Sequence, residues 1–283
     1  MNKGQCLCGT VKWELSAEPE RIYNCHCRMC QKAHGTAFGT YFFMTPGTLK
    51  ITEGQETIVT YRSSEFLTRH SCDTCGSVVP YPGGTGVEEL AVVPGGCHDH
   101  GRQADCNIFV PDAPPWFEVT GPLPRHDAYP EGTGIPDVPD TPLPPKPDGV
   151  VRGSCLCGAV AFHVTEPMKA AFNCHCSRCR RARAAAHASN GFTSAAGVTF
   201  LKGEDNLKRY KLPGAKVFEQ VFCRTCSSPM PRINHQVGNA NIPLGVLDDD
   251  PGIRPMAHIY TDDMAGWHEI TDDTPRHPEG PER

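Results

Sequence analysis

The sequence predicts a mainly β protein made of two copies of one metal-binding domain. Cysteine motifs occur twice in the same order along the chain. Short segments of alternating apolar and polar residues, bounded by turn residues, recur at matching places in the two halves. The length of 283 residues suits about two domains. A repeat of this kind indicates an internal duplication.

The cysteine motifs define the repeat. Each copy has a Cys-Leu-Cys-Gly segment, then an Asn-Cys-His-Cys-Xaa-Xaa-Cys segment, then a Cys-Xaa-Xaa-Cys segment. They begin at Cys6, Asn24 and Cys72 in the first copy, and at Cys155, Asn173 and Cys223 in the second. The offset between copies is 149 residues for the first two motifs and 151 for the third. One insertion of two residues therefore lies before the last motif of the second copy.

Alternating segments predict the strands, which come in matching pairs. The expected strands are 11–15 and 160–164, then 48–51 and 198–201, then 57–61 and 206–210. Pro213-Gly214 marks a longer hairpin loop, where the insertion falls. Only the segments after Cys30 and Cys179 are typical of helix, most clearly the alanine-rich residues 180–186.

The domain boundaries follow from the repeat. We expect a first domain at 1–132, a proline-rich linker at 133–149 and a second domain at 150–283. Pro124-Arg125-His126 recurs as Pro275-Arg276-His277, so the first copy carries its own tail before the linker. The prolines of the linker predict an extended spacer. We expect Trp116 and Trp267 to be repeated core residues, and the two copies to pack as an intramolecular pseudo-dimer.

Charge and hydropathy exclude several classes of partner. A net charge of −5 and a pI near 6.2 argue against nucleic acid or an anionic membrane surface. No apolar run approaches the roughly 18 residues of a membrane-spanning helix. The first motif begins at Cys6, which leaves no room for a signal peptide, so we expect a cytoplasmic protein. In that reducing compartment, sixteen cysteines favour metal ligation over disulfides or an iron–sulfur cluster.

Four cysteines of each copy form a set typical of structural zinc. Four thiolates close a tetrahedral site and leave no open position. The set would join the first strand of the domain to a late turn and close a long loop. The predicted ligands are Cys6, Cys8, Cys72 and Cys75 in the first copy, and Cys155, Cys157, Cys223 and Cys226 in the second.

The other three cysteines of each motif set predict a second zinc ion with an open position, giving four zinc ions per chain. Three protein ligands and one exchangeable position are typical of a reactive zinc. The predicted ligands, which are also the candidate catalytic residues, are Cys25, Cys27 and Cys30, and Cys174, Cys176 and Cys179. A second structural zinc is the alternative. We expect the intervening histidines His26 and His175 to point away from the ion.

Cys97 and Cys106 belong to neither set. At an offset of 151 residues they align with Asp248 and Ala257, so the second copy lacks both thiols. We therefore expect neither cysteine to bind metal.

Charge indicates which chemistry the open zinc would support. Zinc with three thiolates carries a formal negative charge and is a poor Lewis acid for water activation. A thiol that enters as fourth ligand is deprotonated and stays nucleophilic. The site therefore suits addition of a thiol to an electrophile such as an aldehyde, or the reverse reaction. A non-catalytic, zinc-stabilised binding module is the alternative function.

At these motifs both copies resemble the glutathione-dependent formaldehyde-activating enzyme family, which shares its domain with centromere protein V. The resemblance implies two tandem β-tent domains of antiparallel sheets, similar to methionine sulfoxide reductase B. It also implies a carbon–sulfur lyase that forms S-(hydroxymethyl)glutathione from formaldehyde and glutathione. The implied partners are a glutathione-like thiol and an aldehyde, without nucleic acid or membrane.

Three departures from the family pattern distinguish the copies. The glycine that follows the last cysteine is Gly76 in the first copy but Ser227 in the second. The arginine after the middle motif is Arg180 in the second copy and Gln31 in the first. The late His-Ile pair is His258-Ile259 in the second copy and Asn107-Ile108 in the first. All three spare the predicted ligands, so the two copies need not act on the same substrate.

Overall fold

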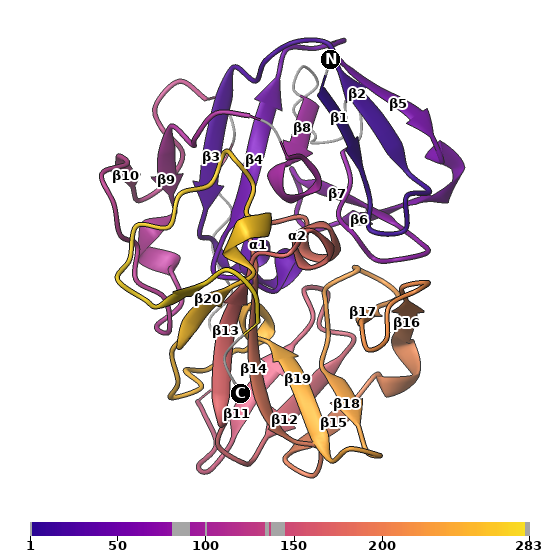
Figure 1. Ribbon diagram of the computed structural model, residues 1–283, viewed down its shortest axis with the longest axis vertical. Helices are drawn as coiled ribbons and strands as arrows, with labels where there is room; N and C mark the ends of the chain where they lie inside the picture. The colour runs from indigo at the N-terminus through magenta and orange to yellow at the C-terminus, as the bar shows by residue number, and fades with distance from the viewer. Residues whose placement is uncertain (1, 81–90, 100, 134–135, 137–144, 281–283) are drawn as a thin grey trace.

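The two halves of the chain form two β-rich domains that pack against each other (Figure 1). The computed structural model describes residues 2–80, 91–99, 101–133, 136 and 145–280. Most of the predicted linker, residues 134–135 and 137–144, lies outside the described residues, so the domain boundaries remain a prediction.

The first domain has two main sheets and a separate hairpin. A three-stranded sheet contains β1 (Asn2–Gln5), β2 (Lys12–Leu15) and β5 (Leu49–Glu53). The central sheet has the order β10-β9-β3-β4-β8, with β3 (Arg21–Cys25), β4 (Gly39–Met44), β8 (Ala91–Pro94), β9 (Cys106–Ile108) and β10 (Arg125–His126). Strands β6 (Ile58–Arg62) and β7 (Thr68–Cys72) form the hairpin. The helix α1 (Arg28–His34) connects β3 to β4.

The second domain repeats this arrangement. Its three-stranded sheet contains β11 (Val151–Ser154), β12 (Ala161–Val164) and β15 (Val198–Lys202). Its central sheet has the order β18-β19-β14-β13-β20-β21, with β18 (Arg232–Asn234), β19 (Asn239–Pro243), β14 (Ala188–Ser194), β13 (Ala170–Cys174), β20 (Ala257–Ile259) and β21 (Arg276–His277). Strands β16 (Leu207–Lys211) and β17 (Glu219–Cys223) form the hairpin, and α2 (Ser177–Arg183) corresponds to α1.

The predicted mainly β class is confirmed, and each predicted strand is found within two residues of its expected bounds. Most strand pairs are antiparallel. The parallel pairs of the first copy are β3 with β9 and β9 with β10. Those of the second copy are β13 with β20 and β20 with β21. These late strands return to the central sheet after a crossover, which permits parallel pairing. The likeness to methionine sulfoxide reductase B stays a prediction.

The helix of the second copy begins three residues before the expected range. The sulfur of Cys176 accepts a hydrogen bond from the Cys179 amide and caps the first turn, so the helix starts inside the cysteine motif. It ends where Ala184 adopts a left-handed conformation, at φ 50°. The first copy has Gly35 at this place, which adopts the same conformation without a Cβ penalty.

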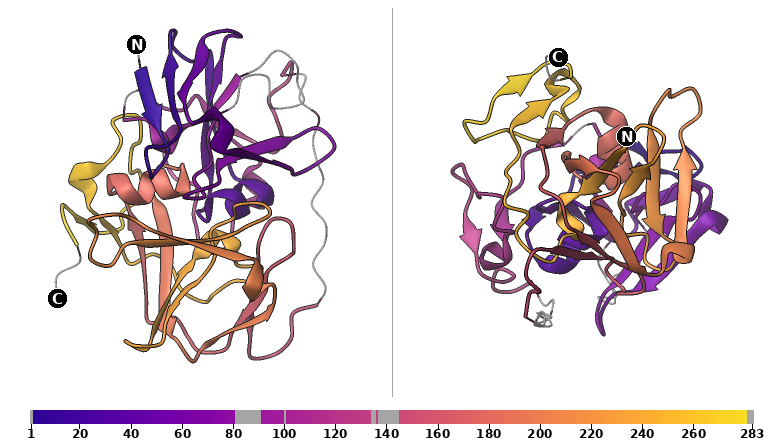
Figure 2. Two further views of the ribbon diagram at one scale, coloured as in Figure 1. Left: turned by 90° about the vertical axis from the view of Figure 1, so that its right-hand side faces the viewer. Right: turned by 90° about the horizontal axis from the view of Figure 1, so that it is seen from below.

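One hydrophobic core runs through both domains. Buried residues of the two copies, among them Trp13, Phe42, Phe162 and Leu244, belong to a single cluster of contacting side chains. The predicted core residues Trp116 and Trp267 are both buried. The left-hand view of Figure 2 agrees with Figure 1 in placing both helices between the domains. The packing expected of a pseudo-dimer is therefore seen.

Two glycines allow the backbones of the copies to touch. They lie in short 3-10 segments, η2 (Gly95–Cys97) and η5 (Leu244–Val246). A Cβ atom on Gly96 would lie 2.0 Å from the amide nitrogen of Ala185, just beyond α2. A Cβ atom on Gly245 would lie 2.4 Å from the amide nitrogen of Thr36, just beyond α1. Each helix end is thus packed on a glycine of the opposite copy.

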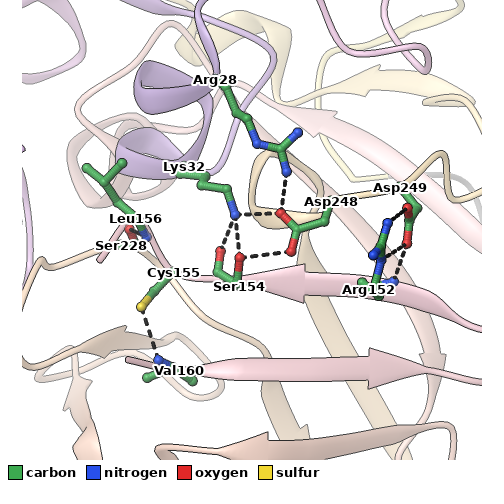
Figure 3. A network of polar contacts seen from close by, with 10 residues as sticks. All are labelled: Arg28, Lys32, Arg152, Ser154, Cys155, Leu156, Val160, Ser228, Asp248 and Asp249. Carbon is green, nitrogen blue, oxygen red and sulfur yellow. Dashed lines mark hydrogen bonds and ion pairs between the residues drawn. The ribbon is translucent and has the colours of Figure 1, made fainter. Parts of the chain in front are cut away.

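Ion pairs across the interface are reciprocal as well. Asp248, from the second copy, accepts hydrogen bonds from Arg28 at 2.5 Å and from Lys32 at 2.6 Å (Figure 3). Asp99, from the first copy, contacts Arg180 at 2.6 Å and Arg181 at 3.5 Å. Because Lys32, Arg180 and Asp248 are largely buried, breaking a pair would leave an uncompensated charge in the interface.

This symmetry corrects one alignment made from the sequence. Strands β8 and β19 end at Pro94 and Pro243, an offset of 149 residues, so a compensating length change precedes them. Cys97 therefore corresponds to Val246, and Asp248 corresponds to Asp99 rather than to Cys97. The reason is that the two residues inserted in the β16–β17 hairpin are compensated by the length change that precedes β19. The alignment of Cys106 with Ala257 holds, because both residues begin matching strands.

In the part of the chain that is described, no helix has the length and apolar character needed to span a membrane.

Replacing either interface glycine should destabilise the protein. We expect Gly96→Ala and Gly245→Ala to lower the thermal midpoint of unfolding, because overpacking costs about 1–3 kcal/mol and here the clash is with backbone. Gly266→Ala is the matched control, since its Cβ would meet the Asp99 carbonyl oxygen at an ordinary 3.6 Å. Equal midpoints for all three variants would contradict the close approach of the two copies.

Candidate metal centre

The fold gathers fourteen of the sixteen cysteines into four groups. In each group the sulfur atoms lie within 4.8 Å of one another. All sixteen thiols are free, so no disulfide competes with metal binding. The groups are Cys6, Cys8, Cys72 and Cys75; Cys155, Cys157, Cys223 and Cys226; Cys25, Cys27 and Cys30; and Cys174, Cys176 and Cys179. These are the sets predicted from the sequence, and each could hold a metal ion.

The four-cysteine groups have the sulfur spacing of a tetrahedral thiolate site. In the first copy, Cys8 Sγ lies 3.4 Å from Cys6 Sγ and 3.6 Å from Cys72 Sγ. The second copy has 3.4 Å and 3.7 Å at the matching positions. Tetrahedral zinc with bonds of about 2.3 Å separates its sulfurs by about 3.8 Å. The residues present therefore fit zinc.

Backbone and side-chain donors also suit thiolates at this site. The amide of Val11 donates to Cys6 Sγ at 3.3 Å, and the amide of Val160 donates to Cys155 Sγ at 3.2 Å. Hydrogen bonds that Cys6 donates to Cys72 and other neighbouring thiols raise the pKa of Cys6, and the hydrogen bond that Cys8 accepts from Cys6 lowers the pKa of Cys8. The crowded thiols thus cannot ionise independently, and a divalent cation would balance several thiolates at once.

The glycine-to-serine departure after the last cysteine is explained by the interface. Gly76 and Ser227 both adopt left-handed conformations, at φ 74° and 59°. A Cβ on Gly76 would lie 2.6 Å from the Phe222 ring of the second copy. In the first copy, Ser71 takes the place of Phe222. Its small side chain leaves room for Ser227 of the second copy, and the two hydroxyls hydrogen-bond at 2.7 Å. The size of the side chain across the interface therefore determines whether glycine or serine fits at this turn.

The three-cysteine groups lie where a strand of the central sheet, β3 or β13, is followed by the site helix, α1 or α2. In the first copy, Cys25 ends β3, Cys27 precedes α1 and Cys30 lies in the first turn of α1. Among the described residues, no histidine, carboxylate or further cysteine joins either group within the same distance. The donor set of three thiols therefore leaves room for another ligand.

Neither intervening histidine belongs to a thiol group, and the Nε2 atom of each lies beside another side chain. His26 Nε2 lies 3.1 Å from Asn107 Oδ1, and His175 Nε2 lies 2.8 Å from His258 Nδ1. The departure from His-Ile to Asn-Ile therefore changes the partner of this histidine. Neither Cys97 nor Cys106 belongs to any of the four groups.

Around the first three-cysteine group, the lining is aromatic and one cation faces the sulfur. Arg69, on β7, approaches Cys30 Sγ at 3.6 Å and donates to Tyr41 Oη at 3.0 Å. Tyr41 in turn lies 3.5 Å from Cys30 Sγ and 2.7 Å from His34 Nε2. Burial raises the pKa of Tyr41 and lowers that of His34 to about 4, so both are neutral near pH 7.

The second group has polar residues at the same places. The strand registers and helix positions pair Tyr41 with Asn190, Arg69 with Gln220, His34 with Arg183 and Met29 with Arg178. A pocket of about 360 Å³ opens beside these thiols. Its lining includes Cys174, Cys176 and Cys179, three arginines (Arg178, Arg183 and Arg232), and Asn190, Gln220 and Asn241.

Basic residues near the motifs have mostly structural partners. Arg28, Lys32 and Arg180 form the interface ion pairs described above. Arg180 also donates to the carbonyl oxygens of His175 and Asp263. In the first copy Gln31 takes its place and donates to the carbonyl oxygen of Asp112. Unlike Arg28, Lys32 and Arg180, Arg178 lines the pocket beside the second thiol group.

A histidine cluster behind the second site was missed by the sequence analysis. The rings of His187, His258 and His268 lie 5.1–5.6 Å from that of His175, and His258 contacts the Asp272 carboxylate at 3.1 Å. Burial lowers the pKa of His175 to about 2, and the pKa of His187 is also far below its ordinary value. The first copy has Phe38, Asn107 and Phe117 at the matching places. Histidines present in one copy alone were the available clue.

Comparison with known proteins finds a family match in each half of the chain. The profile of the family described as glutathione-dependent formaldehyde-activating enzyme (GFA) matches residues 1–114 and 150–263. A Halomonas elongata protein, provisionally named a glutathione-dependent formaldehyde-activating enzyme, is 27% identical over 137 residues, which cover 43% of this chain and 81% of that protein.

A Rhodobacter sphaeroides protein of known crystal structure is also similar. It is 25% identical, and the match covers 37% of this chain and 97% of that one, with a TM-score of 0.30. A score at this level does not establish a common fold. The family match, which spans both cysteine sets of each copy, does not depend on it, and the chain belongs to the glutathione-dependent formaldehyde-activating enzyme family.

Proposed function

We propose that this protein is a zinc-dependent carbon–sulfur lyase that forms and cleaves thiol–aldehyde adducts, with formaldehyde and a glutathione-like thiol as substrates. The observation that carries the proposal is the pair of three-cysteine groups, each without a fourth protein ligand among the described residues. The family match and the name of the Halomonas elongata relative support the choice of substrates. The cytoplasm, where such thiols are kept reduced, is the proposed compartment.

Each copy would hold one structural and one reactive zinc. We assign the structural ions to the four-cysteine groups and the reactive ions to Cys25, Cys27 and Cys30, and to Cys174, Cys176 and Cys179. Zinc bound by three thiolates supplies a position for a thiol and lowers the pKa of that thiol. This chemistry favours a sulfur nucleophile over activated water.

In the reaction, the thiol sulfur forms a bond to the carbonyl carbon while the carbonyl π bond breaks. The thiol proton ends on the former carbonyl oxygen as the hydroxyl of the adduct, and cleavage reverses these steps. In the first copy, Arg69 and Tyr41 donate toward Cys30 and offset the negative charge of the thiolates. Burial of all three sulfurs limits access of water to the site.

The metal content should be four zinc ions per chain. Four plus three cysteines in each copy make two ligand sets, and the sulfur spacing of the larger sets fits zinc. Elemental analysis of protein purified without added metal measures this. A reproducible content of two zinc ions, or of iron in place of zinc, would reject the assignment.

Substitutions in the two kinds of site should have different effects on stability. Cys72→Ser and Cys223→Ser should greatly lower the thermal midpoint, because these sulfurs join segments 64 and 66 residues apart and a structural zinc contributes about 10 kcal/mol or more to folding. Cys27→Ser and Cys176→Ser should lower it less, since their sets are local, while each removes about one zinc. Equal losses of stability in both classes would argue against two kinds of site.

Catalysis is tested by the rate at which formaldehyde and glutathione equilibrate with their adduct. NMR exchange spectroscopy measures this rate with and without the zinc-loaded protein. We expect acceleration that is lost in the double variant Cys27→Ser/Cys176→Ser. An unchanged rate with glutathione and with other small thiols would favour the binding-module alternative.

A further inference from the structure

Arg183 is a buried cation with an unused donor. The residue is 7% exposed, and its Nη1 atom has no hydrogen-bond partner among the described residues. Its Nη2 atom donates to Asn190 Oδ1 at a long 3.3 Å. Burial lowers the pKa of Arg183 to about 10, so the guanidinium is still charged near pH 7. A buried donor without a partner is destabilising, which indicates that another group completes this site.

The surroundings of Arg183 indicate the charge of that group. It lines the same pocket as the three thiols of the second copy, together with Arg178 and Arg232. The pocket contains one carboxylate, Glu219, which is paired with Arg209 at 3.4 Å. Three arginines therefore face a volume of about 360 Å³, which is within the usual range for small-molecule sites. A guanidinium with a free edge binds a carboxylate through parallel hydrogen bonds.

The first copy lacks this arrangement. His34 replaces Arg183, and both of its ring nitrogens have partners: Nδ1 lies 2.6 Å from the Arg183 carbonyl oxygen and Nε2 lies 2.7 Å from Tyr41 Oη. Met29 replaces Arg178. In the first copy the cation beside the thiols is Arg69, which is half-buried on β7. Its two Nη atoms are used by Tyr41 and Cys30, and its Nε atom has no hydrogen-bond partner among the described residues. Neither Nη atom of this cation is therefore left for a ligand.

We propose that Arg183, with Arg178 and Arg232 beside it, forms a carboxylate subsite in the second copy. The site that contains Cys174, Cys176 and Cys179 then selects small thiols that carry a carboxylate, whereas the first site does not use such a charge. The inference rests on the proposed function for the thiol at that site. It assigns a substrate class to one of two copies that share the same cysteine pattern.

Binding of S-methylglutathione tests the subsite without the reaction. This probe keeps both carboxylates of glutathione but has a blocked sulfur. Calorimetric titration of the zinc-loaded full chain should show about one molecule bound per chain, because only the second copy has the subsite. Arg183→Gln should weaken this binding about 10- to 100-fold, the usual range for a hydrogen bond to a charged group. Arg254→Gln is the control, since it removes the same charge at an exposed ion pair with Asp250.

Ester derivatives give a second measurement on the unaltered protein. Glutathione diethyl ester keeps the thiol and lacks both carboxylates, so it should bind the second site more weakly than glutathione by a similar factor. If Arg183→Gln does not fold, this comparison decides alone. The proposal is wrong if the ester binds as tightly as glutathione, or if a folded, zinc-loaded Arg183→Gln protein binds S-methylglutathione as the parent does.

The outcomes separate this inference from the proposed function. Arg183-dependent binding without acceleration of the formaldehyde reaction would remove the lyase proposal and keep the subsite. Acceleration of the reaction together with ester binding as tight as that of glutathione would keep the lyase and remove the subsite.

Discussion

Each site helix is held on two sides at once, and the rest of the structure depends on this constraint. The first turn of α1 carries Cys30, while its later residues Lys32 and His34 contact the second copy. The residue after its cap, Thr36, lies directly over Gly245. In α2 the same positions carry Cys179, Arg181 and Arg183, and Ala185 lies over Gly96. Each of these helices therefore takes part both in the thiol geometry and in the packing of the two copies.

The contact between the two copies explains why some residue differences between them come in matching pairs across the interface. Where a helix end meets backbone, both copies have glycine, because no side chain fits. Where one side chain meets another, the pair as a whole has the right size: Phe222 lies over Gly76, and Ser71 contacts Ser227. A duplicated interface within one chain need not be self-complementary, since each half of a contact can change separately.

Local spacing was enough to predict the three-cysteine groups. Cys25, Cys27 and Cys30 are close in sequence, so a strand end and one helical turn bring them together in any fold of this kind. Joining Cys8 to Cys72 required the recurrence of the whole motif set, because no local rule relates residues 64 positions apart. The strands were found because alternation and turn residues are also local signals.

The residues around the thiols could not be predicted in this way. Arg69 reaches Cys30 only because β7 crosses beside α1, and that register is a property of the folded domain. Lys32 has the sequence context of a surface residue and is instead 9% exposed against Asp248. The symmetry of the two aspartates was hidden by length changes on either side of β17.

A single exchange accounts for much of the difference between the two thiol sites. Tyr41 on β4 contacts His34, Arg69 and Cys30, so its phenol joins the end of the helix, the cation and the sulfur. Asn190 occupies this place on β14 and is too short to make the same three contacts. The cation then comes from the helix as Arg183, which Asn190 Oδ1 meets through one nitrogen. With the same cysteines in both copies, the position of the arginine beside the thiols determines whether its charge is directed at the sulfur or at the pocket.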